Sequence, residues 1–211
     1  MVTITEPVTM LTDYLITIFC TVFVILILGQ TSNPAAYSLA GTLLVTGLGA
    51  FLGGSSHGFK ENLSETTDAR LWKSSTLTIG LGATLFFVSA VLSSLANQFL
   101  IYLLIVIAVI EFLGYAYWMS SHDDFYYVIV NYAALMVIVL ILKLISWLVY
   151  DEPSSLWLIG GVLVTFIASA FQALKIGIHP KYFNHNDVFH IIQLAGLFLV
   201  YQAALVITMI D

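Results

Sequence analysis

The sequence predicts an all-α protein, a bundle of seven transmembrane helices in a single membrane domain. Hydrophobic residues make up 60% of the 211 residues and charged residues only 9%, whereas soluble domains carry about 25% charged residues. Apolar runs long enough to cross the hydrocarbon core recur seven times. The connections between the runs are short and rich in turn-forming residues. We therefore expect nearly the whole chain to lie in the bilayer, without a second domain.

Each predicted span contains roughly 20 apolar residues or more, which is the length that a helix needs to cross a bilayer. The spans cover residues 10–29, 36–57, 69–96, 99–119, 125–149, 155–177 and 188–210. The first run lacks a preceding basic segment and is too long for a cleaved signal peptide. We expect it to be retained as a helix.

Composition also excludes several classes of protein. The net charge of −6 and the lack of a basic stripe exclude nucleic acid as a partner. Cys20 is the only cysteine, so no intrachain disulfide can form. The expected partner is a membrane lipid, bound as substrate or ligand. The sequence leaves the oligomeric state open.

The basic residues are distributed unevenly between the two predicted faces of the membrane. Seven spans place the termini on opposite sides, and we call the side of the N-terminus side A and the other side B. Five of the six basic residues belong to side A: Lys60, Arg70, Lys73, Lys175 and Lys181. Lys143 lies near the far end of the fifth span and is expected to reach the side B surface. The positive-inside rule then predicts a cytoplasmic N-terminus and a C-terminus outside.

All five histidines also fall on side A in this topology. They are His57, His122, His179, His185 and His190. His57 ends the second span, and His190 lies one turn inside the seventh. Polar and ionisable groups at a membrane boundary are costly to dehydrate, so a cluster of them indicates a functional site.

The cluster consists of imidazole and carboxylate side chains, which are common ligands of zinc in proteins. Three protein ligands with one open position for water are typical of catalytic zinc. His57 and His190 share a depth, and the third ligand is expected to be His185, Asp187 or another side A group. His185 and His190 are about 140° apart on a regular helix. Both can face one ion only if His185 precedes the regular helix or a π-bulge intervenes. Asp68 is placed to act as general base or, alternatively, to cap the third helix.

The residues around these positions resemble a known family. Ser55, Ser56 and His57 end the second span, Asp68 opens the third, and Asn-Asp-Val-Phe-His-Ile-Ile, ending at residue 192, opens the seventh. This pattern is similar to the CREST superfamily of membrane hydrolases, which includes alkaline ceramidases and the progestin and adiponectin receptors. The resemblance implies Zn²⁺ held by His57, His190 and a second histidine of the seventh span, with Asp68 and a serine beside the metal; the candidates for these two are His185, and Ser55 or Ser56, of which Ser56 is taken with Asp68 as catalytic. Asn186 and Gly53 stand where the family has a histidine and a serine.

Three further polar residues are candidates for supporting the site. Asp187 either belongs to the ligand set or interacts with the dipole of the seventh helix at its first turn. Gln193, three residues past His190, can orient a ligand through a hydrogen bond. Glu111 lies deep in the fourth span, where a carboxyl should be protonated or partnered. It is either a structural hydrogen-bond donor or a polar wall of the substrate cavity.

These observations favour a zinc-dependent intramembrane hydrolase of a lipid amide or ester. The alternative is a seven-helix receptor or lipid-binding membrane protein with a structural metal site. A transporter or haem protein is disfavoured, because transporters bind substrate near the midplane and here the polar groups gather at one face. A retinal protein is disfavoured because the last span contains no lysine.

Overall fold

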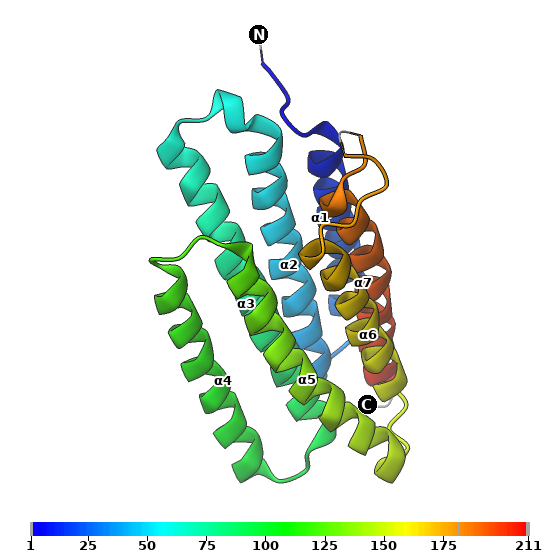
Figure 1. Cartoon of the computed structure of the whole chain (residues 1–211). Helices are drawn as coiled ribbons and strands as arrows, with labels where there is room; N and C mark the ends of the chain where they lie inside the picture. Colours follow the sequence, from blue (N-terminus) through cyan, green and yellow to red (C-terminus); the bar gives the residue numbers. More distant parts are fainter. Residues whose placement is uncertain (1, 181, 210–211) are drawn as a thin grey trace.

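The computed structural model describes residues 2–180 and 182–209 and consists of seven α-helices in an up-and-down bundle, in which successive helices run in opposite directions (Figure 1). The helices are α1 (Pro7–Leu28), α2 (Pro34–Phe59), α3 (Glu65–Ser94), α4 (Gln98–Met119), α5 (Phe125–Tyr150), α6 (Ser155–Ala173) and α7 (His185–Met209). A short 3₁₀ turn, η1 (Lys60–Asn62), follows α2, and no strand occurs among the described residues. All seven helices are long and apolar enough to cross a membrane. The predicted fold class is confirmed.

Six of the helices form a closed ring. Each helix of the ring packs against the next in the order α1, α2, α3, α5, α6, α7, and α7 packs against α1. α4 lies outside this ring and packs against α3, at the edge of the bundle in Figure 1. The first and last helices are therefore neighbours, and residues from both ends of the chain can meet inside the ring.

The contact between α1 and α2 depends on glycines of α2. A Cβ atom on Gly54 would lie 2.7 Å from the Cβ of Asp13, and one on Gly47 would lie 2.9 Å from the Cβ of Cys20. Real Cβ atoms do not approach so closely, so only glycine allows this helix spacing, as in other small-residue helix contacts within membranes. The close approach places Asp13 beside the wall of α2.

Local hydrogen bonds set the helix boundaries, and several boundaries differ from the prediction by a few residues; α1 and α3, for example, begin three and four residues early, at Pro7 and Glu65. α7 begins at His185, three residues early, where the Asn184 side chain accepts a hydrogen bond from the Asn186 N–H at 2.7 Å. α6 ends at Ala173, four residues early, and Lys175 follows in the left-handed conformation with φ of 55°, which terminates helices. Residue 210 of the predicted seventh span and the basic Lys181 lie outside the described residues.

The side B end of the bundle contains a buried ion pair. Lys143 does not reach the side B surface as expected. Its side chain is fully buried, and its Nζ lies 3.0 Å from Glu152 Oε2 and 2.8 Å from Ser93 Oγ. Burial raises the pKa of Glu152, but hydrogen bonds from Ser154 and Ser155 and the charge of Lys143 hold it below its ordinary value. This network joins α3, α5 and the start of α6.

Candidate functional site

A cavity of about 120 Å³ lies inside the ring of six helices, toward side A. Most of its surface is apolar, with aromatic walls from Trp72, Phe125 and Phe189. Its polar groups include Asp13, His57, Ser75, Gln172, Asn186 and His190. An apolar hollow with a few convergent polar groups is typical of ligand sites. No residue of α4 lines it.

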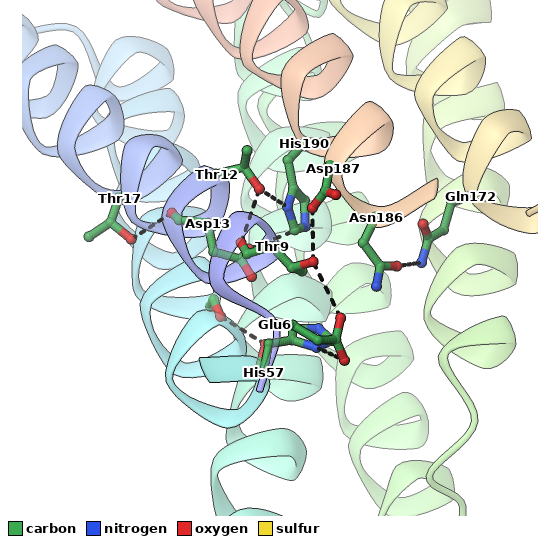
Figure 2. Close-up of polar contacts among 12 residues, drawn as sticks. Glu6, Thr9, Thr12, Asp13, Thr17, His57, Gln172, Asn186, Asp187 and His190 are labelled. Carbon is green, nitrogen blue, oxygen red and sulfur yellow. Dashed lines mark hydrogen bonds and ion pairs between the residues drawn. The ribbon is translucent and has the colours of Figure 1, made fainter. Parts of the chain in front are cut away.

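His190 and Asp13 form the polar centre of the cavity, and both are buried (Figure 2). His190 Nε2 lies 3.2 Å from Asp13 Oδ1, and His190 Nδ1 lies 2.9 Å from Thr12 Oγ1. Thr12 donates its only hydroxyl proton to the Thr9 carbonyl at 3.0 Å, so the hydrogen bond to the imidazole must come from the Nδ1–H of His190. Nε2 therefore faces Asp13, and a single proton is shared between the two groups.

A second set of contacts connects His57 to the start of α7. His57 Nδ1 lies 3.5 Å from Glu6 Oε1, and Thr9 Oγ1 lies 3.3 Å from Glu6 Oε2 and 2.8 Å from Asp187 Oδ1 (Figure 2). Asp187 also accepts a hydrogen bond from the Asn184 N–H at 2.7 Å. The bond to His57 lowers the pKa of Glu6, against the smaller effect of burial. Asp187 thus fastens the first turn of α7 to α1.

Ser56 and Asp68 lie together, but on the outer side of His57. Ser56 Oγ donates to Asp68 Oδ1 at 2.5 Å. Both line a separate surface hollow, and His57 and Trp72 line this hollow as well as the cavity. Asp68 does not cap α3, since the N-cap is Ser64. The two residues predicted to be catalytic therefore do not line the cavity, and His57 lies between them and the cavity.

The structure does not bring His185 together with the other predicted zinc ligands. α7 is helical from His185 onward, and five residues of helix turn His185 away from His190. His185 lines another side A hollow with Glu6 and Asp187. Among residues 2–180 and 182–209, no three His, Cys, Asp or Glu side chains stand in positions that could hold a metal ion.

The amide side chains at the far wall of the cavity come from α6 and α7. Gln172 Nε2 donates to Asn186 Oδ1 at 2.8 Å, and Gln172 Oε1 is buried without a hydrogen-bond partner. Gln193 lines the cavity one turn beyond His190, as its spacing predicts. Glu111 is not a wall of the cavity, because α4 lies outside the ring.

Asp13 and Thr12 are the site residues that sequence reasoning missed. The sequence did contain a signal for Asp13, because an ionisable residue inside an apolar run is by default a functional candidate. The site residues predicted from the sequence lie at or near the ends of the spans, apart from Glu111. The position of Asp13 opposite His190 depends on the contact between α1 and α7, which hydropathy does not predict.

Comparison with known proteins identifies the family of the chain. No match is found among curated proteins or among solved structures. A family of unknown function, DUF6962, matches residues 8–208. This range covers nearly all of the seven helices and includes the cavity residues Asp13 and His190. The chain therefore belongs to the DUF6962 family.

Proposed function

We propose that the protein is a metal-dependent intramembrane hydrolase of a lipid amide or ester, with its reaction centre in the cavity. One observation carries the proposal: His57, His190 and Asp13, from three different helices, line one mostly apolar cavity. Two imidazoles and a carboxylate form a donor set that suits Zn²⁺. The three side chains do not stand in positions to hold one ion in this structure, so in this proposal they close around the metal when it binds. The apolar walls suit a lipid acyl chain.

The arrangement of the two histidines supports zinc as the metal. Glu6 engages Nδ1 of His57, and Thr12 engages Nδ1 of His190, so Nε2 is the remaining nitrogen in both rings. Metal-binding histidines are oriented in this way by a partner on the second nitrogen. The 3.2 Å between His190 Nε2 and Asp13 Oδ1 is close to the spacing of about 3.3 Å between two ligands of a tetrahedral zinc. In this proposal Asp13 takes the place expected for His185.

The residues around the cavity divide the remaining work of hydrolysis. Bound Zn²⁺ would supply a water of lowered pKa and polarise the substrate carbonyl. Thr12 holds the His190 ring in place, and the aromatic walls keep bulk water away from the reacting carbonyl. Asp68 lies outside the cavity, behind His57, so the proton released during attack would reach its carboxylate, which Ser56 holds in position, only through an intervening water.

A second candidate is a lipid-binding or receptor-like membrane protein without turnover. The specific observation that favours it is that Asp13 and His190 already satisfy each other, while no three candidate ligands converge among the described residues. In that case the cavity holds a lipid and the polar pair recognises its head group. Retention of lipid without hydrolysis distinguishes this candidate from the first.

The proposal includes an orientation in which side A, and hence the mouth of the site, faces the cytoplasm. The support is that Lys60, Arg70 and Lys73 lie in or near the α2–α3 connection, at the same end of the bundle as the N-terminus (Figure 1). Reporter fusions to the two termini test it. A cytoplasmic C-terminus would contradict it.

The experiment that tests the function combines elemental analysis with an assay on matched lipid amides and esters. We expect about one zinc per chain and zinc-dependent hydrolysis, both lost in His57→Ala and His190→Ala. His122→Ala is the matched control, because His122 stacks on Trp118 away from the cavity. Protein that contains neither metal nor activity would overturn the hydrolase, and co-purified lipid would then favour the binding protein.

A further inference from the structure

The cavity has a small polar niche on its α2 side, at Gly53. A Cβ atom on Gly53 would lie 3.2 Å from Ser75 Oγ and 3.9 Å from Asp13 Oδ2, and among the described residues it would meet no other atom of a neighbouring helix within 4 Å. Gly53, Ser75 and Asp13 are all buried, and all three line the cavity. The missing side chain of Gly53 therefore leaves a space within the cavity between two polar oxygen atoms.

Both of these oxygen atoms are hydrogen-bond acceptors toward the niche. Ser75 Oγ donates its only proton to the Gly49 carbonyl at 2.8 Å, so it presents lone pairs to the cavity. The proton that Asp13 shares with His190 lies at Oδ1, so Oδ2 can only accept, and no described residue donates a hydrogen bond to it. A buried acceptor without a donor is unfavourable. The niche therefore favours an occupant that donates hydrogen bonds.

The charges around the cavity narrow the chemistry of this occupant. Among the described residues, no lysine or arginine lines the cavity, so an anionic head group would find no counter-ion there. An ammonium group would have to leave water for a mostly apolar site in which His190 already engages the carboxylate of Asp13, and this desolvation is costly. The occupant that fits is a neutral donor, such as a hydroxyl or an amide N–H group.

We propose that Asp13 Oδ2 and Ser75 Oγ, on either side of Gly53, bind a neutral hydrogen-bond donor of the lipid in the cavity. The inference rests on the proposed function only in that the cavity holds a lipid, with or without turnover. Oδ1 of Asp13 stays free for His190 or the metal. Ser75 thus determines specificity and takes no part in bond cleavage. A lipid without the donor leaves both acceptors unpaired, and sites of this kind discriminate against such analogues.

The test measures the binding of four lipids of equal chain length to the purified full-length protein in nanodiscs. Hexadecanol donates an O–H group and N-methylhexadecanamide an N–H group, whereas N,N-dimethylhexadecanamide and methyl hexadecanoate donate neither. We expect at least one donor to bind about tenfold more tightly than both non-donors, which is about the effect of one hydrogen bond. A preference for the alcohol alone identifies a hydroxyl as the donor, and one for the secondary amide alone identifies the N–H group. Binding is measured with and without a chelator, so that metal-dependent turnover cannot distort the values.

Two variants with matched controls locate the preference in the niche. Gly53→Ala fills the niche and Ser75→Ala removes one acceptor, so both should abolish the preference. Gly41→Ala adds a Cβ to α2 equally close to an α3 side chain, at 3.2 Å. Ser89→Ala removes an equivalent hydrogen bond of 2.8 Å from α3 to an α2 carbonyl. Both control positions lie away from the cavity lining, so these variants should keep the preference, and thermal unfolding compares the stability within each pair.

Wild-type protein that binds none of the four lipids, or binds donors and non-donors equally, would overturn the inference. A preference that survives Gly53→Ala or Ser75→Ala, or one that is lost equally in the control variants, would also overturn it. Zinc content and hydrolysis are measured on the same samples. If both are absent while the donor preference is present, the hydrolase is overturned and the donor-binding niche stands.

Discussion

His190 Nε2 and Asp13 Oδ1 are 3.2 Å apart inside the ring of helices, although they belong to the last and the first helix. The pair exists because α7 closes the ring against α1. Thr12 fixes the other side of the imidazole. The orientation of both groups toward the cavity therefore depends on contacts between the two ends of the chain.

Replacing Thr12 tests how the His190 ring is held. Thr12→Val keeps the shape of the side chain but leaves the buried Nδ1–H of His190 without an acceptor. An unsatisfied buried donor costs about 1–3 kcal/mol, so the melting temperature in detergent should fall. Thr21→Val, at an exposed threonine of α1, should leave it nearly unchanged. Equal effects of the two substitutions would mean that His190 does not depend on Thr12.

Asp68→Asn separates proton transfer from metal binding. Asp68 lies behind His57 and outside the cavity, so the variant should keep its zinc. The amide preserves the shape but cannot accept a proton near neutral pH, and we expect the hydrolysis rate to fall by about 10²–10⁴. Loss of zinc from Asp68→Asn would make Asp68 a ligand instead. Unchanged activity would leave Asp68 with the structural role of binding Ser56.

Glu152→Gln removes the charge that balances Lys143. Since Lys143 is fully buried, the substitution leaves a buried cation without its counter-ion, which costs about 3–5 kcal/mol. Asp151→Asn, one residue earlier and exposed, is the matched control. The double variant Lys143→Met, Glu152→Gln should recover much of the lost stability. A Glu152→Gln protein as stable as the control would show that the ion pair contributes nothing.

Stability at acidic pH should depend on Glu6. The hydrogen bond with His57 lowers the pKa of Glu6 below its ordinary value of 4.5. A carboxyl with a lowered pKa stabilises the fold fully above that ordinary value, and the contribution is lost as the pH falls through the folded-state pKa. The melting temperature of the wild type should therefore decrease below pH 4.5 more steeply than that of Glu6→Gln. Glu61→Gln should retain the steep decrease, and identical profiles for all three proteins would contradict this role.

The sequence was sufficient to predict the seven helices, because length and hydropathy alone determine which segments can cross a bilayer. It also placed His57 and His190 at one depth, and both line the cavity. What it could not supply was the rotation of each helix about its axis. Rotation is set by packing, as where Gly54 lets α1 approach α2 and puts Asp13 at the cavity. The placement of His185 depended on a helix start three residues earlier than hydropathy indicated.

Two other residues show the same limit. Lys143 was expected to extend to the surface, but Glu152 follows a turn that brings its carboxylate back to the buried ammonium group. Glu111 was a possible cavity wall, but α4 packs outside the ring. In both cases the sequence indicates how deep the residue lies along its span, but it does not indicate which residues surround its side chain.

The most direct test of the proposed site is the zinc content of three purified proteins: the wild type, Asp13→Asn and His185→Ala. If His57, His190 and Asp13 hold the metal, the wild type and His185→Ala contain about one zinc per chain, and Asp13→Asn contains little or none. Full zinc in Asp13→Asn together with loss from His185→Ala would contradict this ligand set and restore the one inferred from the sequence. A wild-type protein free of zinc after purification without chelators would contradict the metal site altogether.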